Sequence, residues 1–204
     1  MCRWFDSALG HQLPIPDYDQ PFGFSNAFLS GMNAPPQRPP AVAPACLVLG
    51  ALLGLAGSFA PSASLRGLAW GLDGTLLVVA AALLVVHCLR RNLDLLAAGF
   101  LVFVAGQTLV VSGSAMTLES GSPLFAAGAA LWAAGLLLVS IPRVMPALAR
   151  VSGVLAAVLF AATSAQIFAG RPLTPLSEPL PFFAYPVFVV TLFTWAWWCR
   201  KSTP

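Results

Sequence analysis

The sequence has very little charge and almost no lysine. Charged residues make up 8% of its 204 positions, whereas about 25% is usual in a soluble domain. Water therefore could not solvate the whole surface of the folded chain. Nine of the ten basic residues are arginine, and with abundant alanine, glycine and proline this usage indicates a GC-rich bacterial source. The net charge of +3 predicts no nucleic-acid partner, because the basic residues lie at the ends of apolar segments and form no patch.

Catalytic and metal-binding motifs are also missing. The sequence contains no GxSxG, no HExxH, no phosphate-binding glycine loop and no CxxC pair, and its only histidines are His11 and His87. We therefore expect a protein that is not an enzyme, with no catalytic residue, no metal site and no cofactor.

What the sequence does have is six long apolar segments. Each is about as long as a helix must be to cross a hydrocarbon core of roughly 30 Å, and only helices satisfy their own backbone groups there. We predict an all-α integral membrane protein, a six-transmembrane-helix bundle with short loops. The predicted spans are residues 42–60, 70–89, 95–114, 124–141, 152–170 and 182–199.

Basic residues between these segments predict the orientation. Seven of them fall on one side of the predicted membrane and two on the other, and short loops rich in arginine and lysine stay in the cytoplasm. Both termini should then be cytoplasmic and the protein should lie in a bacterial inner membrane, with its cysteines reduced. The seven are Arg38, Arg90, Arg91, Arg143, Arg150, Arg200 and Lys201; the two are Arg66 and Arg171.

Residues 1–41 differ from the rest in being rich in proline, with no helical or strand period. Two interpretations stay open. They form a disordered cytoplasmic tail, or Met32 is the true start and residues 1–31 are a mis-assigned one. Residues 200–204 should form a second, short cytoplasmic tail.

Glycines recur at intervals of seven in three predicted spans. This spacing puts them on one helix face, where a neighbouring backbone can approach closely. The predicted packing positions are Gly50, Gly54, Gly57, Gly99, Gly106, Gly113, Gly128 and Gly135. The arrangement as glycine-rich helical hairpins resembles small six-helix bacterial membrane families such as the acid-resistance proteins, which implies a role in envelope stress.

Asp73 is the only charged residue well inside a predicted span. One interpretation is structural, because the residue lies close to the predicted start of its helix, where the helix dipole favours a carboxylate. The other is a proton, cation or substrate site, since ionisable groups inside a membrane are usually functional. An outward-opening polar cavity would include Asp73, Gln107, Ser114, Thr163 and Gln166; alternatively these groups only bond between helices.

The last predicted span carries aromatic residues at both ends. Phe182, Phe183 and Tyr185 fall at its outer end, and a tryptophan cluster (Trp195, Trp197 and Trp198) falls at its inner end. Both groups predict aromatic belts that anchor the helix at the two interfaces.

Two functions remain open on this basis. The first is a small permease or channel for a small solute or ion, using the polar groups around Asp73. The alternative is a non-catalytic accessory or assembly subunit of a membrane complex, or an envelope-stress protein. Either would have the lipid bilayer as its surroundings, and a second copy or another membrane protein as a partner.

Overall fold

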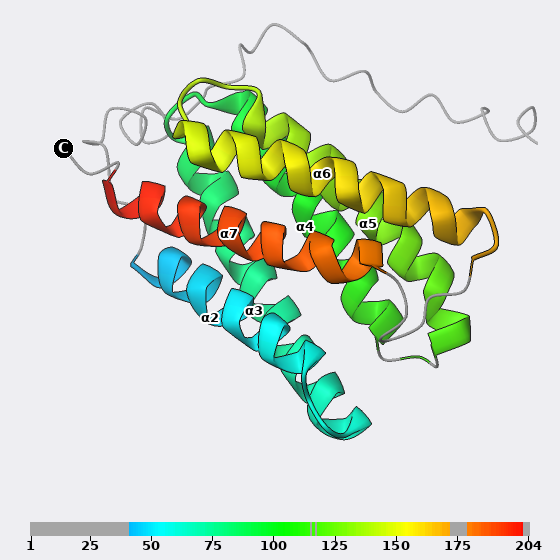
Figure 1. The fold of residues 1–204 in the computed structure, drawn as a ribbon. Helices are drawn as coiled ribbons and strands as arrows, with labels where there is room; N and C mark the ends of the chain where they lie inside the picture. Colours follow the sequence, from blue (N-terminus) through cyan, green and yellow to red (C-terminus); the bar gives the residue numbers. More distant parts are fainter. Residues whose placement is uncertain (1–40, 115, 117, 172–178, 202–204) are drawn as a thin grey trace, which may run out of the picture. The chain divides into compact units, whose positions relative to one another are not determined.

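The computed structural model describes residues 41–114, 116, 118–171 and 179–201, and within these ranges it contains six helices and no strand (Figure 1). All six belong to one compact unit, Pro36–Pro204. The all-helical class is as predicted, whereas residues 1–40 of the predicted tail at 1–41 lie outside the described ranges. The helices are α2 (Val42–Ser58), α3 (Ala63–Leu89), α4 (Asp94–Ser114), α5 (Leu118–Ser140), α6 (Ala147–Phe168) and α7 (Pro179–Lys201).

Four of these helices, α3 to α6, are long and apolar enough to cross a membrane. Helix α2 is also apolar but has 17 residues. These lengths and compositions support a membrane protein.

Five of the six helices begin earlier than the sequence pattern predicts, α3 and α5 by the most. Helix α3 starts at Ala63, because the hydroxyl of Ser62 accepts a hydrogen bond of 3.3 Å from the Leu65 backbone and caps a first turn that lies outside the apolar segment. Helix α5 starts at Leu118 and carries Pro123 inside it, although proline usually marks a helix start or break. Asp73 consequently lies ten residues into α3, about 15 Å from its first residue, beyond the reach of the helix dipole.

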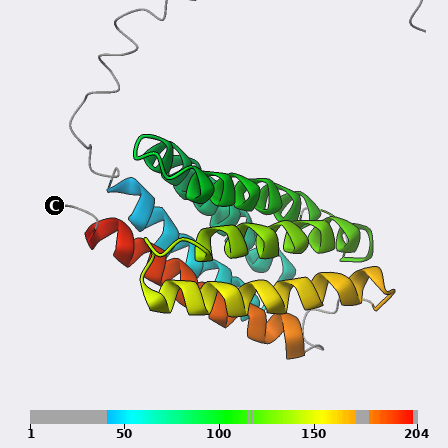
Figure 2. The same cartoon turned by 90° about the horizontal axis from the view of Figure 1, so that it is seen from above.

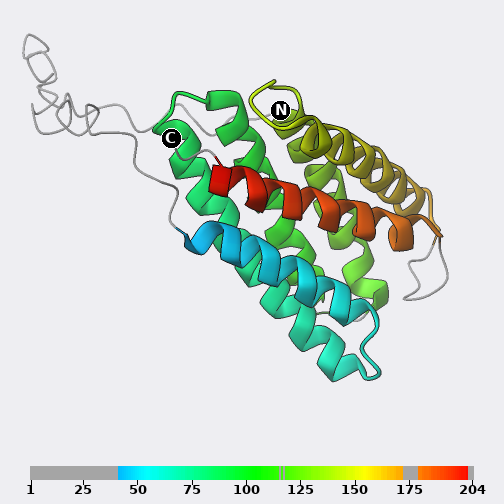
Figure 3. The same cartoon turned by 60° about the vertical axis from the view of Figure 1, so that its left-hand side comes forward.

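The six helices form a closed ring in chain order. Each packs against its neighbours in the sequence, and α7 returns to pack against α2, while no other pair of described helices has close backbone contacts. Figure 2 shows this succession, and Figure 3 shows α7 between α2 and α6. The start of α2 and the end of α7 therefore lie at the same end of the ring (Figure 1).

Helices α4 and α5 make the closest backbone contact, along a row that we call the glycine seam. Three glycines of α4 face three of α5 in antiparallel register: Gly99 opposite Gly135, Gly106 opposite Gly128, and Gly113 opposite Gly121. A Cβ atom added at Gly106 would lie 2.8 Å from the carbonyl oxygen of Gly128, and the reverse addition gives the same distance. Gly121, which is not among the predicted packing positions, completes the third pair.

Aromatic side chains fill the middle of the ring and form what we call the aromatic core, namely Phe100 and Phe103 of α4, Trp132 of α5, Phe160 of α6, and Phe188 and Trp195 of α7. The Trp132 ring stacks on Phe188 with centroids 5.3 Å apart, and Phe188 also meets Phe103 at 5.7 Å. These contacts join helices that do not touch through their backbones, so the centre of the ring is packed.

This packing corrects the predicted inner aromatic belt. Trp195 is 1% exposed and belongs to the aromatic core, and Trp198 is also buried. Only Trp197 of the predicted inner cluster is exposed. At the predicted outer end, Tyr185 turns toward the aromatic core and contacts Phe188, with ring centroids 5.9 Å apart. The side chains of the two neighbouring phenylalanines lie outside the described residues.

The glycine seam predicts the effect of adding one methyl group. We expect Gly106→Ala to lower the free energy of unfolding by about 1–3 kcal/mol, because its Cβ would press on a backbone carbonyl that cannot rotate away. Gly71→Ala is the matched control, since no atom lies within 4 Å of the position its Cβ would take. Reversible unfolding in mixed detergent–SDS micelles measures both, and equal stabilities would contradict the close contact.

Candidate functional site

Asp73 lies buried between three helices. Its side chain, on α3, is 5% exposed. The hydroxyl of Tyr185, on α7, donates a hydrogen bond of 3.1 Å to Asp73 Oδ2, so this pair links two helices that are not backbone neighbours. The other oxygen, Oδ1, is buried and has no hydrogen-bond partner among the described residues. We call Asp73, Tyr185, Gly50 and Gly54 the carboxyl site.

The two glycines of α2 make the room for this pair. A Cβ added at Gly50 would lie 3.3 Å from Asp73 Oδ1. A Cβ added at Gly54 would overlap the Tyr185 hydroxyl and lie 2.6 Å from Asp73 Oδ2. Bare backbone on α2 therefore lies directly against the carboxyl group and the phenol.

Trp70 of α3, one helical turn before Asp73, forms a hydrogen bond that links α3 to α2. Its indole nitrogen donates a hydrogen bond of 3.3 Å to the carbonyl oxygen of Gly54, which also accepts 3.2 Å from the Ser58 hydroxyl. The edge of the indole ring lies 2.5 Å from where a Cβ at Gly57 would stand. The glycine face of α2 thus receives the Trp70 side chain as well as the carboxyl site.

Gln107 approaches α3 from the other side. It is 1% exposed, and its Oε1 is a second buried oxygen with no hydrogen-bond partner among the described residues. Its Nε2 lies 3.1 Å from where a Cβ at Gly74 would stand. Asp73 and Gly74 are consecutive on α3, so the structure brings Gln107 to the helix turn that carries the carboxyl group.

The remaining predicted cavity residues lie elsewhere. Thr163 and Gln166 are on α6, which packs against α5 and α7 but not against α3. The Thr163 hydroxyl donates to the Leu159 carbonyl of its own helix at 2.9 Å, and Gln166 is half-buried. The side chain of Ser114 is outside the described residues. Of the predicted set, Asp73 and Gln107 therefore lie at the same turn of α3, with Asp73 against α2 and Gln107 against Gly74.

Tyr185 is the member of the site that sequence reasoning missed. Its place near one end of a span is typical of an interface anchor. The residues around it in the sequence give no indication of a hydrogen-bond partner 112 positions away. The available signal was chemical: a buried carboxyl group needs a donor, and Tyr185 is one of only two tyrosines in the chain.

The opposite end of α3 carries a second polar group. His87 is buried, and its Nε2 has no hydrogen-bond partner within the described part of the chain. Its ring lies edge-on to Trp198 with centroids 6.5 Å apart. Cys46, Cys88 and Cys199 are buried free thiols. Within the described part of the chain, no three histidine, cysteine or acidic residues are grouped as a metal site would require.

No family model matches the chain, and no curated protein or solved structure is significantly similar to it. The chemistry of the carboxyl site is therefore the main indication of function.

The bond between Asp73 and Tyr185 predicts coupled effects on stability. We expect Asp73→Ala and Tyr185→Phe each to destabilise the fold. Their double variant should show a coupling energy of about 0.6 kcal/mol, the mean measured for hydrogen bonds between membrane helices, and no more than the measured maximum of about 1.7 kcal/mol. The cycle is read from reversible unfolding in mixed micelles. A control cycle pairs Tyr185→Phe with Thr108→Val, on the exposed side of α4, and should give a coupling near zero; equal coupling in the two cycles would contradict a specific bond.

Proposed function

We propose that all six helices span the membrane and that both termini are cytoplasmic. The closed ring supports six spans, because α2 packs on the long apolar helix α3, α7 packs on the long apolar helix α6, and α2 and α7 pack on each other. Helix α2, with 17 residues, is about 26 Å long, close to the hydrocarbon thickness of roughly 30 Å. The orientation rests on the seven-to-two distribution of basic residues.

We further propose that the protein is a small permease for a small solute or ion, with the carboxyl site as its binding group. The observation that carries this proposal is the unpartnered Oδ1 of Asp73, buried ten residues inside α3. An acceptor oxygen left unpaired away from water costs free energy, and ionisable groups inside membranes usually mark ion or substrate pathways. A proton, a cation or a donor group of a solute would supply the missing partner, and the unpaired oxygen of Gln107 lies beside the same turn.

Transport through this fold requires helix movement. The aromatic core closes the centre of the ring, so a solute that enters at the carboxyl site has no open route past Phe103, Trp132 and Phe188. Helix α2 is the element whose displacement would uncover Asp73, because its glycines lie directly on the carboxyl group. The bond from Trp70 to Gly54 opposes that displacement.

A second function, an accessory or assembly subunit, is favoured by a different observation. Several buried hydroxyls bond to their own helix and offer little to a solute: Ser140 donates to Leu136, and Thr191 donates to Val187. Together with the filled centre, this supports a protein that serves as a packed membrane scaffold for another subunit.

The orientation is tested by cysteine labelling from outside the cell. In a variant without the four native cysteines, we expect Pro61→Cys, in the exposed turn before α3, to react with a membrane-impermeant maleimide in intact cells. Arg143→Cys, in the exposed turn before α6, should react only after the cells are opened. The reverse pattern would place the termini outside, and equal labelling of both sites in intact cells would contradict six spans.

The permease proposal is tested in proteoliposomes. We expect the purified protein to carry solute or proton flux, followed by an enclosed pH dye and by radiolabelled small cations, amines and organic acids. Asp73→Asn should lower the rate by about tenfold or more, since it removes the ionisable group. Asp94→Asn is the matched control, because that carboxylate is exposed at the start of α4.

Three results separate the possible outcomes of this experiment. A folded Asp73→Asn variant with the wild-type rate would exclude the carboxyl site from transport. The absence of any flux from the wild-type protein would move the accessory function to first place. A stoichiometric membrane protein that co-purifies with the tagged chain would then identify the complex it serves.

A further inference from the structure

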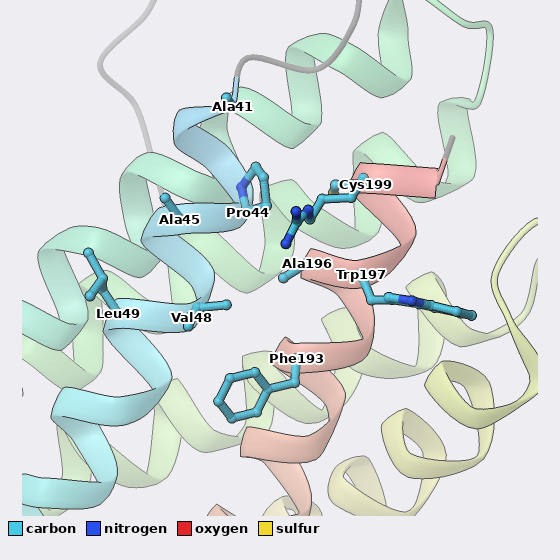
Figure 4. Close-up of a pocket in the computed structure, with 10 residues that line it drawn as sticks. Ala41, Pro44, Ala45, Val48, Leu49, Phe193, Ala196, Trp197 and Cys199 are labelled. Atoms are coloured by element: carbon cyan, nitrogen blue, oxygen red, sulfur yellow. The ribbon is translucent and has the colours of Figure 1, made fainter. Parts of the chain in front are cut away.

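A groove runs along the outside of the ring between α2 and α7 (Figure 4). It has a volume of about 850 Å³. The labelled residues in Figure 4 come from both helices. Its apolar lining includes Ala45, Val48 and Leu49 of α2, and Phe193, Ala196 and Trp197 of α7. Leu49 and Trp197 are among the exposed large side chains of the protein, so the groove opens to the surroundings of the ring.

The length of the groove matches one leaflet of a bilayer. Along α2 its lining extends from Ala41 to Leu49, which is about 12 Å of helix. Half of a hydrocarbon core of roughly 30 Å is about 15 Å. The groove begins at the end of the ring where α2 starts and α7 finishes, and it reaches toward the level of the membrane centre.

Positive charge lies at that end of the groove. Arg200 is part of the lining, and the ammonium group of the next residue, Lys201, lies 4.1 Å from the centroid of the Trp197 ring. Tryptophan is favoured at the level of lipid headgroups, and arginine and lysine there attract anionic lipids. One end of the groove therefore suits a negatively charged group, and the rest suits a hydrocarbon chain.

We propose that the α2–α7 groove binds an anionic phospholipid, with one acyl chain along the groove and the phosphate at Arg200 and Lys201. Phosphate and guanidinium form charge-assisted hydrogen bonds of complementary geometry. The small side chains of Ala45 and Ala196 leave the space for the chain between the larger Leu49 and Trp197. This site is separate from the carboxyl site and does not depend on the protein being a permease.

Native mass spectrometry of the purified protein tests the proposal, with dioleoyl phosphatidylglycerol and dioleoyl phosphatidylcholine added at equal concentration. We expect the anionic lipid to be retained preferentially by the wild-type protein. The double variant R200Q/K201Q should reduce that preference by about tenfold or more, because it removes both surface charges. The matched control is R143Q, an exposed arginine outside the groove.

A second variant tests the apolar part of the groove. A45F should reduce retention of both lipids because its ring would occupy the chain position, whereas A82F, at an exposed position of α3 outside the groove, should not. Unfolding midpoints verify that each variant is folded. Three results would each overturn the proposal. The wild-type protein could retain the two lipids equally, or R200Q/K201Q and A45F could bind lipid as the wild type does. A45F could also release a second copy of the chain, which would show that the groove holds another protomer and not a lipid.

Discussion

Close approach of bare backbone is the constraint on which this structure depends. Lipid chains are as apolar as leucine, so membrane helices gain little from burying apolar surface against each other, and dispersion contacts at short range must hold them together. The glycine seam supplies such contacts between α4 and α5, where a single Cβ at Gly106 would lie 2.8 Å from a carbonyl oxygen. The glycines of α2 supply them again beside Asp73. Contacts of the same kind therefore both hold α4 to α5 and shape the polar site.

Helix α7 connects the interior of the ring to both candidate sites. Its Tyr185 hydroxyl bonds to Asp73, its Phe188 and Trp195 belong to the aromatic core, and its last turn carries the cations beside the groove. A movement of α7 would disturb the carboxyl site and the groove together.

Trp195 and Asp73 show where sequence reasoning and structure diverge. The sequence pattern places Trp195 at an interface, because tryptophan at the end of an apolar segment is typically found there, but its neighbours in space, Phe100 and Phe103, are about 90 positions earlier. The position of Asp73 near a helix start was inferred from hydropathy. The Ser62 cap, a hydrogen bond that hydropathy does not measure, moves that start to Ala63.

The sequence by itself determined the helical class, the apolar character and the approximate extent of each helix. Length and hydropathy are local properties of a segment, and they decide whether that segment can form a helix inside a membrane. It also determined which glycines share a helix face, because helical periodicity alone fixes this. Only the tertiary structure decided that α7 closes the ring on α2, that Gly121 completes the glycine seam, and that Tyr185 is the partner of Asp73. Those outcomes depend on which helices meet and in what register, and such contacts join residues too distant in the chain for local patterns to report.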